Sequence, residues 1–133
     1  MGLFHDFQIS GSGMNVYRKW MDALSDNIAN VNTYTSTDGP AFQERFVEAQ
    51  SANINGSGGG VQVKAIRYGD ADGMLVYQPD NPLADEDGNV KAPSMNMSDQ
   101  MTNMIIAQRA YQANVQSIDR ARNAYEAALS LGK

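Results

Sequence analysis

Apolar residues recur every seven positions at both ends of the chain, and the middle lacks this repeat. Near the start, the repeat runs through Phe7, Met14, Met21 and Ile28, with Tyr17, Leu24 and Val31 three residues later. Near the end, it runs through Met97, Met104, Tyr111, Ile118 and Tyr125, with Met101, Val115 and Leu129 four residues later. A narrow apolar stripe of this kind is typical of a helix that packs lengthwise on another helix. The sequence predicts helices over residues 14–31 and 97–131.

The start of the first helix allows two interpretations. The segment Ser10-Gly11-Ser12-Gly13 consists of poor helix formers. The helix either begins there, with Ser12 as its cap, or passes through the segment as a flexible point of a longer helix. Residues 1–9 are expected to be frayed in the isolated chain. The helix should end near residues 30–33, because Asn and Thr side chains compete for backbone hydrogen bonds.

The second helix carries clearer boundary signals. Asn96 is a plausible N-cap, and Asp99 follows three residues later in the capping-box position. Gly132 stands where a C-terminal cap residue is expected. Gln108 and Arg122 interrupt the apolar stripe. They either lie at its edge with their long side chains reaching water, or fix the register of neighbouring helices.

The middle of the chain predicts short strands and turns. Residues 61–68 alternate apolar and polar side chains, which indicates a strand, and residues 74–78 are expected to pair back on it through a turn at 70–73. Residues 41–49 fit either a helix or a strand. The Gly- and Ser-rich residues 55–60 are expected to form a flexible connection. Prolines and the Asp87-Gly88 pair exclude regular structure from Pro79 to about Asn89.

These elements predict an α+β fold. The N- and C-terminal helices form a coiled-coil-like pair, the core domain, and a small β-rich, loop-rich middle domain connects them. The expected divisions are residues 1–33, 34–95 and 96–133. One narrow stripe against one partner helix buries too little apolar surface to offset the entropy of ordering, so we expect the terminal helices to become firm only in an assembly.

Charge is concentrated in the middle segment. The 133-residue chain has a net charge of −5. Residues 32–96 contain nine acidic and four basic side chains and therefore carry about −5, whereas the two ends are nearly neutral. An acidic middle argues against binding to nucleic acid, which requires clustered Lys and Arg. No stretch reaches the ~18 apolar residues of a membrane span, and the first residues do not resemble a cleavable signal peptide. The Met1-Gly2 start fits myristoylation poorly, because Asp6 replaces the required Ser or Thr.

The sequence offers no convincing catalytic or cofactor site. His5 is the only histidine and there is no cysteine, which excludes thiolate chemistry and makes a catalytic triad improbable. An EF-hand loop around Asp85–Gly88 would place Leu83 and Ser94 at its first and twelfth ligand positions, so an acidic turn is the better interpretation. Gly56–Gly60 lacks the Lys-Ser/Thr pair of a phosphate-binding loop. We therefore predict no catalytic residue, no cofactor and no metal.

The apolar stripes instead predict an assembly interface. The residues expected to contact neighbouring molecules are Met14, Tyr17, Met21, Leu24 and Ile28 on the first helix and Met104, Tyr111, Val115 and Ile118 on the second. Trp20 lies beside this stripe, at the edge of the core or as an interface anchor.

Several motifs resemble a known family. Residues 9–14, Arg18, Met21-Asp22 and residues 25–33 resemble the N-terminal signature of the bacterial flagellar axial proteins. The core of that signature is Ser25, Asn27, Ile28, Ala29, Asn30, Asn32 and Thr33. Residues 81–90 and 104–115 are similar to the second-helix region of a proximal rod protein. Asn27, Asn30 and Asn32 either set the helix end locally or bond to neighbouring subunits.

The resemblance implies a structural subunit of the flagellar basal-body rod and not an enzyme. Such subunits polymerise helically into a shaft that crosses the periplasm and carries motor torque to the hook and filament. They are exported by the flagellar type III apparatus without a cleaved signal. The implied partners are further copies, the rod proteins FlgB, FlgF and FlgG, and the junction protein FliE, without nucleic acid or membrane insertion. The alternatives are another short rod protein such as FlgB, or a secreted coiled-coil adaptor or effector that never polymerises.

Overall fold

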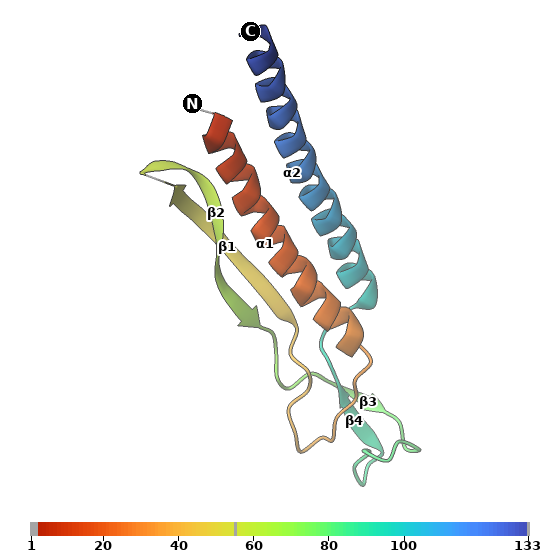
Figure 1. Cartoon of the computed structure of the whole chain (residues 1–133). Coiled ribbons are helices and arrows are strands. Elements are labelled where there is room, and N and C mark those ends of the chain that lie inside the picture. Colours follow the sequence, from red (N-terminus) through yellow and green to blue (C-terminus); the bar gives the residue numbers. More distant parts are fainter. Residues whose placement is uncertain (1–2, 55, 133) are drawn as a thin grey trace. The chain divides into compact units, whose positions relative to one another are not determined.

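The computed structural model describes residues 3–54 and 56–132 and has two long helices with two small sheets (Figure 1). The helices are α1 (Leu3–Asn30) and α2 (Met97–Leu131). The strands are β1 (Arg45–Ile54), β2 (Ser57–Tyr68), β3 (Met74–Tyr77) and β4 (Asn89–Ala92). This arrangement confirms the predicted α+β class. Within the described residues, no helix combines the length and apolar character needed to cross a membrane.

Helix α1 begins earlier than the sequence suggested. It runs without interruption from Leu3 through Ser10–Gly13, so the expected frayed start is helical from residue 3 onward, and residues 1 and 2 lie outside the described part. Ser12 is inside the helix and does not cap it. Its hydroxyl donates to the Ile9 carbonyl at 2.6 Å and accepts from the Val61 backbone N–H at 3.1 Å. The second interpretation, a longer helix through this segment, is therefore the observed one.

The inner helix boundaries agree with the sequence. Helix α1 ends at Asn30, whose side-chain amide donates to the Asp26 carbonyl at 2.8 Å and whose own carbonyl accepts from the Thr33 N–H at 3.0 Å. The Asn96 side-chain oxygen accepts from the Ser98 N–H at 2.7 Å, which confirms the predicted N-cap of α2. Helix α2 ends at Leu131, directly before Gly132.

The chain forms two compact units, and each takes segments from both ends and from the middle. The first unit comprises Met1–Met21, Val47–Ala65 and Ile105–Lys133, and the second comprises Asp22–Phe46 and Ile66–Met104. The middle segment thus contributes to both units. The division at residues 33 and 95 stays a prediction.

In the first unit, small residues let α1 approach its neighbours closely. A side-chain carbon added to Gly13 would lie 3.0 Å from the Asn114 side-chain oxygen on α2, and Ser10 and Gly13 are both buried. On the hairpin side, β2 contacts α1 where Val61 bonds to Ser12 and Gly59 meets Ile9. Helix α1 therefore packs against both α2 and the β1–β2 hairpin (Figure 1). Gly13, a poor helix former, is tolerated because a larger side chain there would push α1 away from Asn114 on α2.

We predict opposite effects for leucine at the two helical glycines. Gly13→Leu should lower the free energy of unfolding by about 1–3 kcal/mol, because the added side chain must displace Asn114. Gly11→Leu is the matched control, since nothing lies within 4 Å of its side-chain position. It should be neutral or stabilise the protein by up to about 1 kcal/mol through helix propensity. Urea denaturation followed by circular dichroism measures both, and equal losses would contradict the tight approach at Gly13.

The strand pairing differs from the expectation. β2 pairs with β1, and β3 pairs antiparallel with β4, with Met74 opposite Ala92 and Tyr77 opposite Asn89. The prediction that residues 74–78 pair with 61–68 was therefore wrong, because β3 takes its partner from the segment that leads into α2. The ambiguous segment 41–49 becomes a strand from Arg45 onward. Residues 57–60 belong to β2 and not to a flexible connection, and Asn55 lies outside the described residues.

The second unit has a small core at β4. Val90 is fully buried and Ala92 is buried beside it, whereas Leu75 and Tyr77 on the neighbouring strand are exposed. Thr35 adds a short bridge to β4 at Lys91, with both backbone hydrogen bonds at 2.9 Å. Together these contacts hold the segment that follows α1 against the strand that leads into α2.

Candidate assembly interface

The structure divides the nine predicted interface residues into two groups. Leu24 is 2% exposed and belongs to the core of its own subunit. The others are partly buried and keep part of each side chain accessible; they are Met14, Tyr17, Met21, Ile28, Met104, Tyr111, Val115 and Ile118. Each of the eight could contact a neighbouring molecule, and that role stays a prediction.

Residues beside the apolar stripe make the closest intramolecular contacts, and the sequence analysis missed them. The buried positions of α1 include Val16 and Ala23 as well as Gly13, and α2 buries Ala107. The available signal was their small size. A Gly or Ala beside an apolar stripe lets two helices approach closely, whereas the large side chains of the stripe remain at the periphery.

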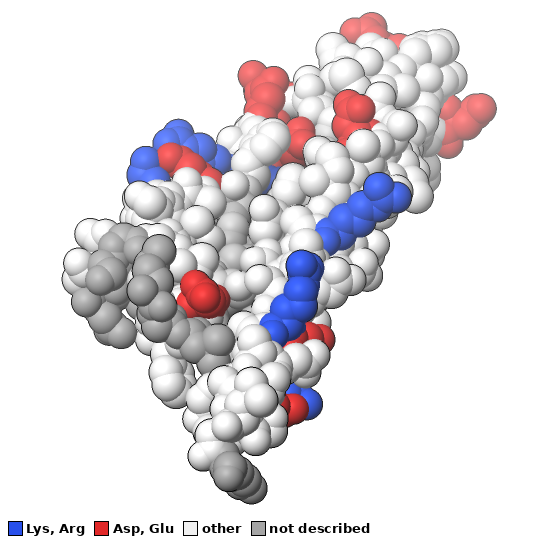
Figure 2. Space-filling view, turned by 90° about the horizontal axis from the view of Figure 1, so that it is seen from above, with Lys and Arg blue, Asp and Glu red and all other residues white. Residues whose placement is uncertain are grey.

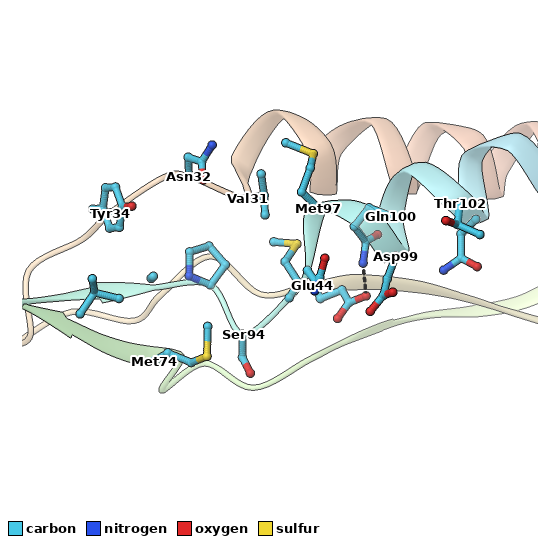
Figure 3. Close-up of a pocket in the computed structure, with 16 residues that line it drawn as sticks. Val31, Asn32, Tyr34, Glu44, Met74, Ser94, Met97, Asp99, Gln100 and Thr102 are labelled. Carbon is cyan, nitrogen blue, oxygen red and sulfur yellow. Dashed lines mark hydrogen bonds between the residues drawn. The ribbon is translucent and has the colours of Figure 1, made fainter.

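A polar cluster in the second unit joins the end of α1, the start of β1 and the start of α2. Asn27 is 0% exposed and Gln100 is 2% exposed. The Asn27 amide donates at 3.0 Å both to the Arg45 carbonyl and to the Gln100 side-chain oxygen, and its oxygen accepts from the Arg45 N–H at 2.9 Å. The Gln100 amide donates to Glu44 at 2.5 Å, as the dashed line in Figure 3 marks. The Arg45 guanidinium forms an ion pair with Asp26.

The remaining signature residues lie around this cluster. Ser25, Ala29, Asn32 and Thr33 are exposed, whereas Ile28 and Asn30 are partly buried. Asn27 and Asn30 make hydrogen bonds within their own subunit, as the local interpretation of these amides requires. Asn32 reaches the surface, so bonding to a neighbouring subunit remains open for this position.

A groove of about 1010 Å³ lies in the same unit. Its walls come from the end of α1, the β3–β4 sheet and the first turns of α2, and Figure 3 shows Asn32, Met74, Met97 and Asp99 around it. The lining mixes methionines with amides and a few acids. Among the described residues, no three His, Cys, Asp or Glu side chains are placed to hold a metal ion.

The first unit has a smaller apolar hollow between α1 and the hairpin, of about 280 Å³. Its lining is Val16, Tyr17, Trp20, Val47, Ala49 and Val61. The rings of Tyr17 and Trp20 are 6.3 Å apart. Trp20 is partly buried here, at the edge of the packed layer.

The last turns of α2 have no cover within the subunit. Residues 122–132 are all exposed, including Tyr125 at 46%, Leu129 at 55% and Leu131 at 88%. We call residues 122–131 the α2 tail. Gln108 and Arg122 are exposed as well, and Arg122 pairs with Glu126 at 3.1 Å. Both side chains therefore reach solvent within the subunit.

The remaining sequence features have local roles. The Asp85 carboxylate accepts backbone N–H groups of Asp87 at 3.0 Å and Asn89 at 2.8 Å, so this segment is an acidic turn. His5 is partly buried on α1, near Gly59 of the hairpin. On the face seen in Figure 2, acidic and basic side chains are interspersed, and the basic ones do not gather into one large patch.

Known proteins resemble this chain along its whole length. The family model described as "Flagellar basal body rod FlgEFG protein C-terminal" matches residues 86–131. The chain is 34% identical over 134 residues to the flagellar basal-body rod protein FlgC of Salmonella typhimurium and 35% identical over 134 residues to that of Yersinia enterocolitica. FlgC of Bacillus subtilis is 29% identical over 150 residues. Each of these alignments covers 100% of both chains.

The two long helices, the small β region and these matches define a structural subunit of the flagellar basal-body rod. The chain belongs to the FlgC family of rod proteins. The resemblance inferred from the sequence motifs is thereby confirmed, and the rod subunit is favoured over a non-polymerising adaptor or FlgB. The homologues are structural proteins of the flagellum.

Proposed function

We propose that this rod subunit polymerises helically into the periplasm-spanning shaft that carries torque to the hook and filament, and that it has no catalytic role. The α2 tail is the observation that supports this most directly. Its three large apolar residues are exposed although they belong to a regular helix. An uncovered helix end is only marginally stable in water, so neighbouring molecules are the expected cover.

The α2 tail is also the part that we expect to become ordered on assembly. The expectation of weakly ordered terminal helices rests on one partner for each helix. Helix α1 instead has two neighbours, α2 and the hairpin, which bury more of its surface. We therefore expect only residues 122–131, and not both terminal helices, to become ordered on assembly.

The proposed neighbours are further copies of the chain, the rod proteins FlgB, FlgF and FlgG, and the junction protein FliE. We further propose that the subunit reaches the rod in the periplasmic space through the flagellar type III apparatus, without a cleaved signal. The near-neutral terminal segments favour close packing of many helices, because they carry little charge to repel one another.

The proposal is tested by sedimentation of the purified protein mixed with purified rod components. The unmodified subunit should enter large, fast-sedimenting assemblies, because its donor and acceptor surfaces differ and their association does not close. A variant with Met21→Asn and Ile28→Asn should remain in small species, and cells that carry it should lack basal bodies and not swim. Lys19→Asn on the exposed part of α1 is the control.

Two results would contradict the proposal. An unmodified subunit that stops at one small complex would favour the adaptor. Normal swimming with intact basal bodies in the Met21→Asn, Ile28→Asn variant would show that the apolar stripe is not an assembly surface.

A further inference from the structure

The apolar stripes of α1 and α2 repeat too regularly to fix one register between the helices. Both repeat every seven residues. A shift by one repeat, about 10 Å along a helix axis, would again place apolar side chains opposite apolar side chains. Hydrophobic burial has no direction and tolerates such a shift. A contact that occurs only once along the helices therefore contributes to selecting the register: Gly13 approaches Asn114 in the first unit, and a buried polar pair joins the helices in the second.

The pair Asn27–Gln100 is such a contact. Both amides are almost completely removed from water, and they are 3.0 Å apart, from the Asn27 nitrogen to the Gln100 oxygen. Among the residues whose burial the structure describes, Ser10 is the only other buried polar one. A buried amide pair at one position of an apolar helix interface selects a register, because every other alignment breaks the hydrogen bond between the two amides.

The surrounding contacts make this selection specific. One repeat along α2 from Gln100, Asn27 would face the region of Ala107, whose side chain cannot accept its hydrogen bond. In the other direction, α2 stops at its first residue, Met97, before a full repeat is reached. Glu44 holds the Gln100 amide nitrogen, which directs the Gln100 oxygen toward Asn27. The Asn27 side chain also pairs with both backbone groups of Arg45, so the start of β1 is tied to the same point.

We propose that Asn27 and Gln100 are positioning residues that, within the second unit, set the register of α1 on α2 and the entry of β1. From the sequence, fixing the register is one of two interpretations for Gln108 and Arg122. Both of these residues are exposed in the subunit. Fixing one register gives the subunit a single arrangement of its partly buried stripe residues. Only this last consequence rests on the proposed rod function; the register itself is a property of the subunit.

The absence of cysteine allows a direct measurement of the register. Nitroxide labels at Ala29→Cys and Thr102→Cys, both exposed positions of the second unit, report the distance between α1 and α2 by pulsed electron spin resonance. The labelled parent should show one narrow distance. Adding Asn27→Leu and Gln100→Leu should produce a second population, displaced by roughly 5–10 Å, that is, by one turn or one repeat. Asn103→Leu, an amide on the same helix, is the matched control and should keep the single distance.

A single, unchanged distance in the doubly substituted protein would overturn the proposal, even if its melting temperature fell, because the amides would then only stabilise the subunit. If circular dichroism shows that this protein is unfolded, Gln100→Leu alone decides by the same criterion, since it keeps the bonds between Asn27 and Arg45. The distances do not depend on polymerisation. If the proposed rod function were wrong, the sedimentation of the unmodified subunit would show it. The distances between the two labels would not change.

Discussion

Cells whose subunit carries Tyr125→Ala and Leu129→Ala are expected not to swim, although the subunit itself should fold normally. Both side chains are about half exposed in the subunit, so its free energy of unfolding should change by less than about 0.5 kcal/mol. Alanine keeps the helix propensity of the α2 tail. In the rod, burial of the exposed half of each side chain would contribute about 1 kcal/mol per subunit, and this contribution is repeated at every contact. Soft-agar swimming and denaturation of the purified protein measure the two effects separately.

The matched control replaces polar residues of the same tail. Asn123→Ala and Ser130→Ala lie among the same exposed turns and remove no large apolar surface, so these cells should swim like the parent. Normal swimming of the Tyr125→Ala, Leu129→Ala cells would show that the α2 tail is not an assembly contact. Equal defects in both variants would indicate that the tail acts through something other than apolar burial.

Gly73→Ala is expected to destabilise the subunit strongly, by about 2–5 kcal/mol when the cost of a positive φ and of overpacking are combined. Gly73 has φ +64° between β2 and β3, and an added side-chain carbon would lie 2.3 Å from the Ala92 carbonyl oxygen and 2.6 Å from Ala41. The Ala92 oxygen belongs to the backbone of β4, so it cannot rotate away. Thermal or urea unfolding measures the loss, and the fraction of folded protein in cells should fall with it.

Gly56→Ala separates the cost of the positive φ from the cost of overpacking. Gly56 has a similar backbone angle, φ +77°, but nothing lies within 4 Å of its side-chain position. This variant should lose only the conformational part, about 1–2 kcal/mol. If both variants lost the same free energy, the close approach of β4 to Gly73 would not contribute.

Local signals predicted the helices well and the strand pairing poorly. The repeat and the Asn96 cap located α2 to the residue, because a cap and an apolar period depend on neighbours in sequence. The partner of Met74–Tyr77 could not be obtained in this way, since Asn89–Ala92 follows a loop of prolines and turns and no local signal connects the two segments. The Asn55-Gly56 dipeptide was a usable signal, because Asn-Gly between two strands favours a tight hairpin. It was interpreted as part of a flexible connection.

In the candidate interface, too, local patterns predicted some features and only the tertiary structure showed the others. The stripe residues were identified from their spacing, but spacing could not tell that Leu24 belongs to the core or that the α2 tail is uncovered. Gln100 had no signal of its own, because a glutamine near a helix start is usually a surface residue. Its importance arises from Asn27 and Glu44, which are distant from it in the sequence.

The sequence by itself determined that this protein has two long terminal helices, a small β region between them, no thiol chemistry, and motifs of the flagellar axial proteins. These properties follow from residue types and from periods that a short stretch of chain specifies. The tertiary structure alone decided which strands pair, which glycines must stay glycines, and which two amides meet at the centre of the second unit. Those outcomes depend on surfaces brought together from distant parts of the chain, where close packing and the pairing of buried polar groups select one arrangement among several that the local pattern allows.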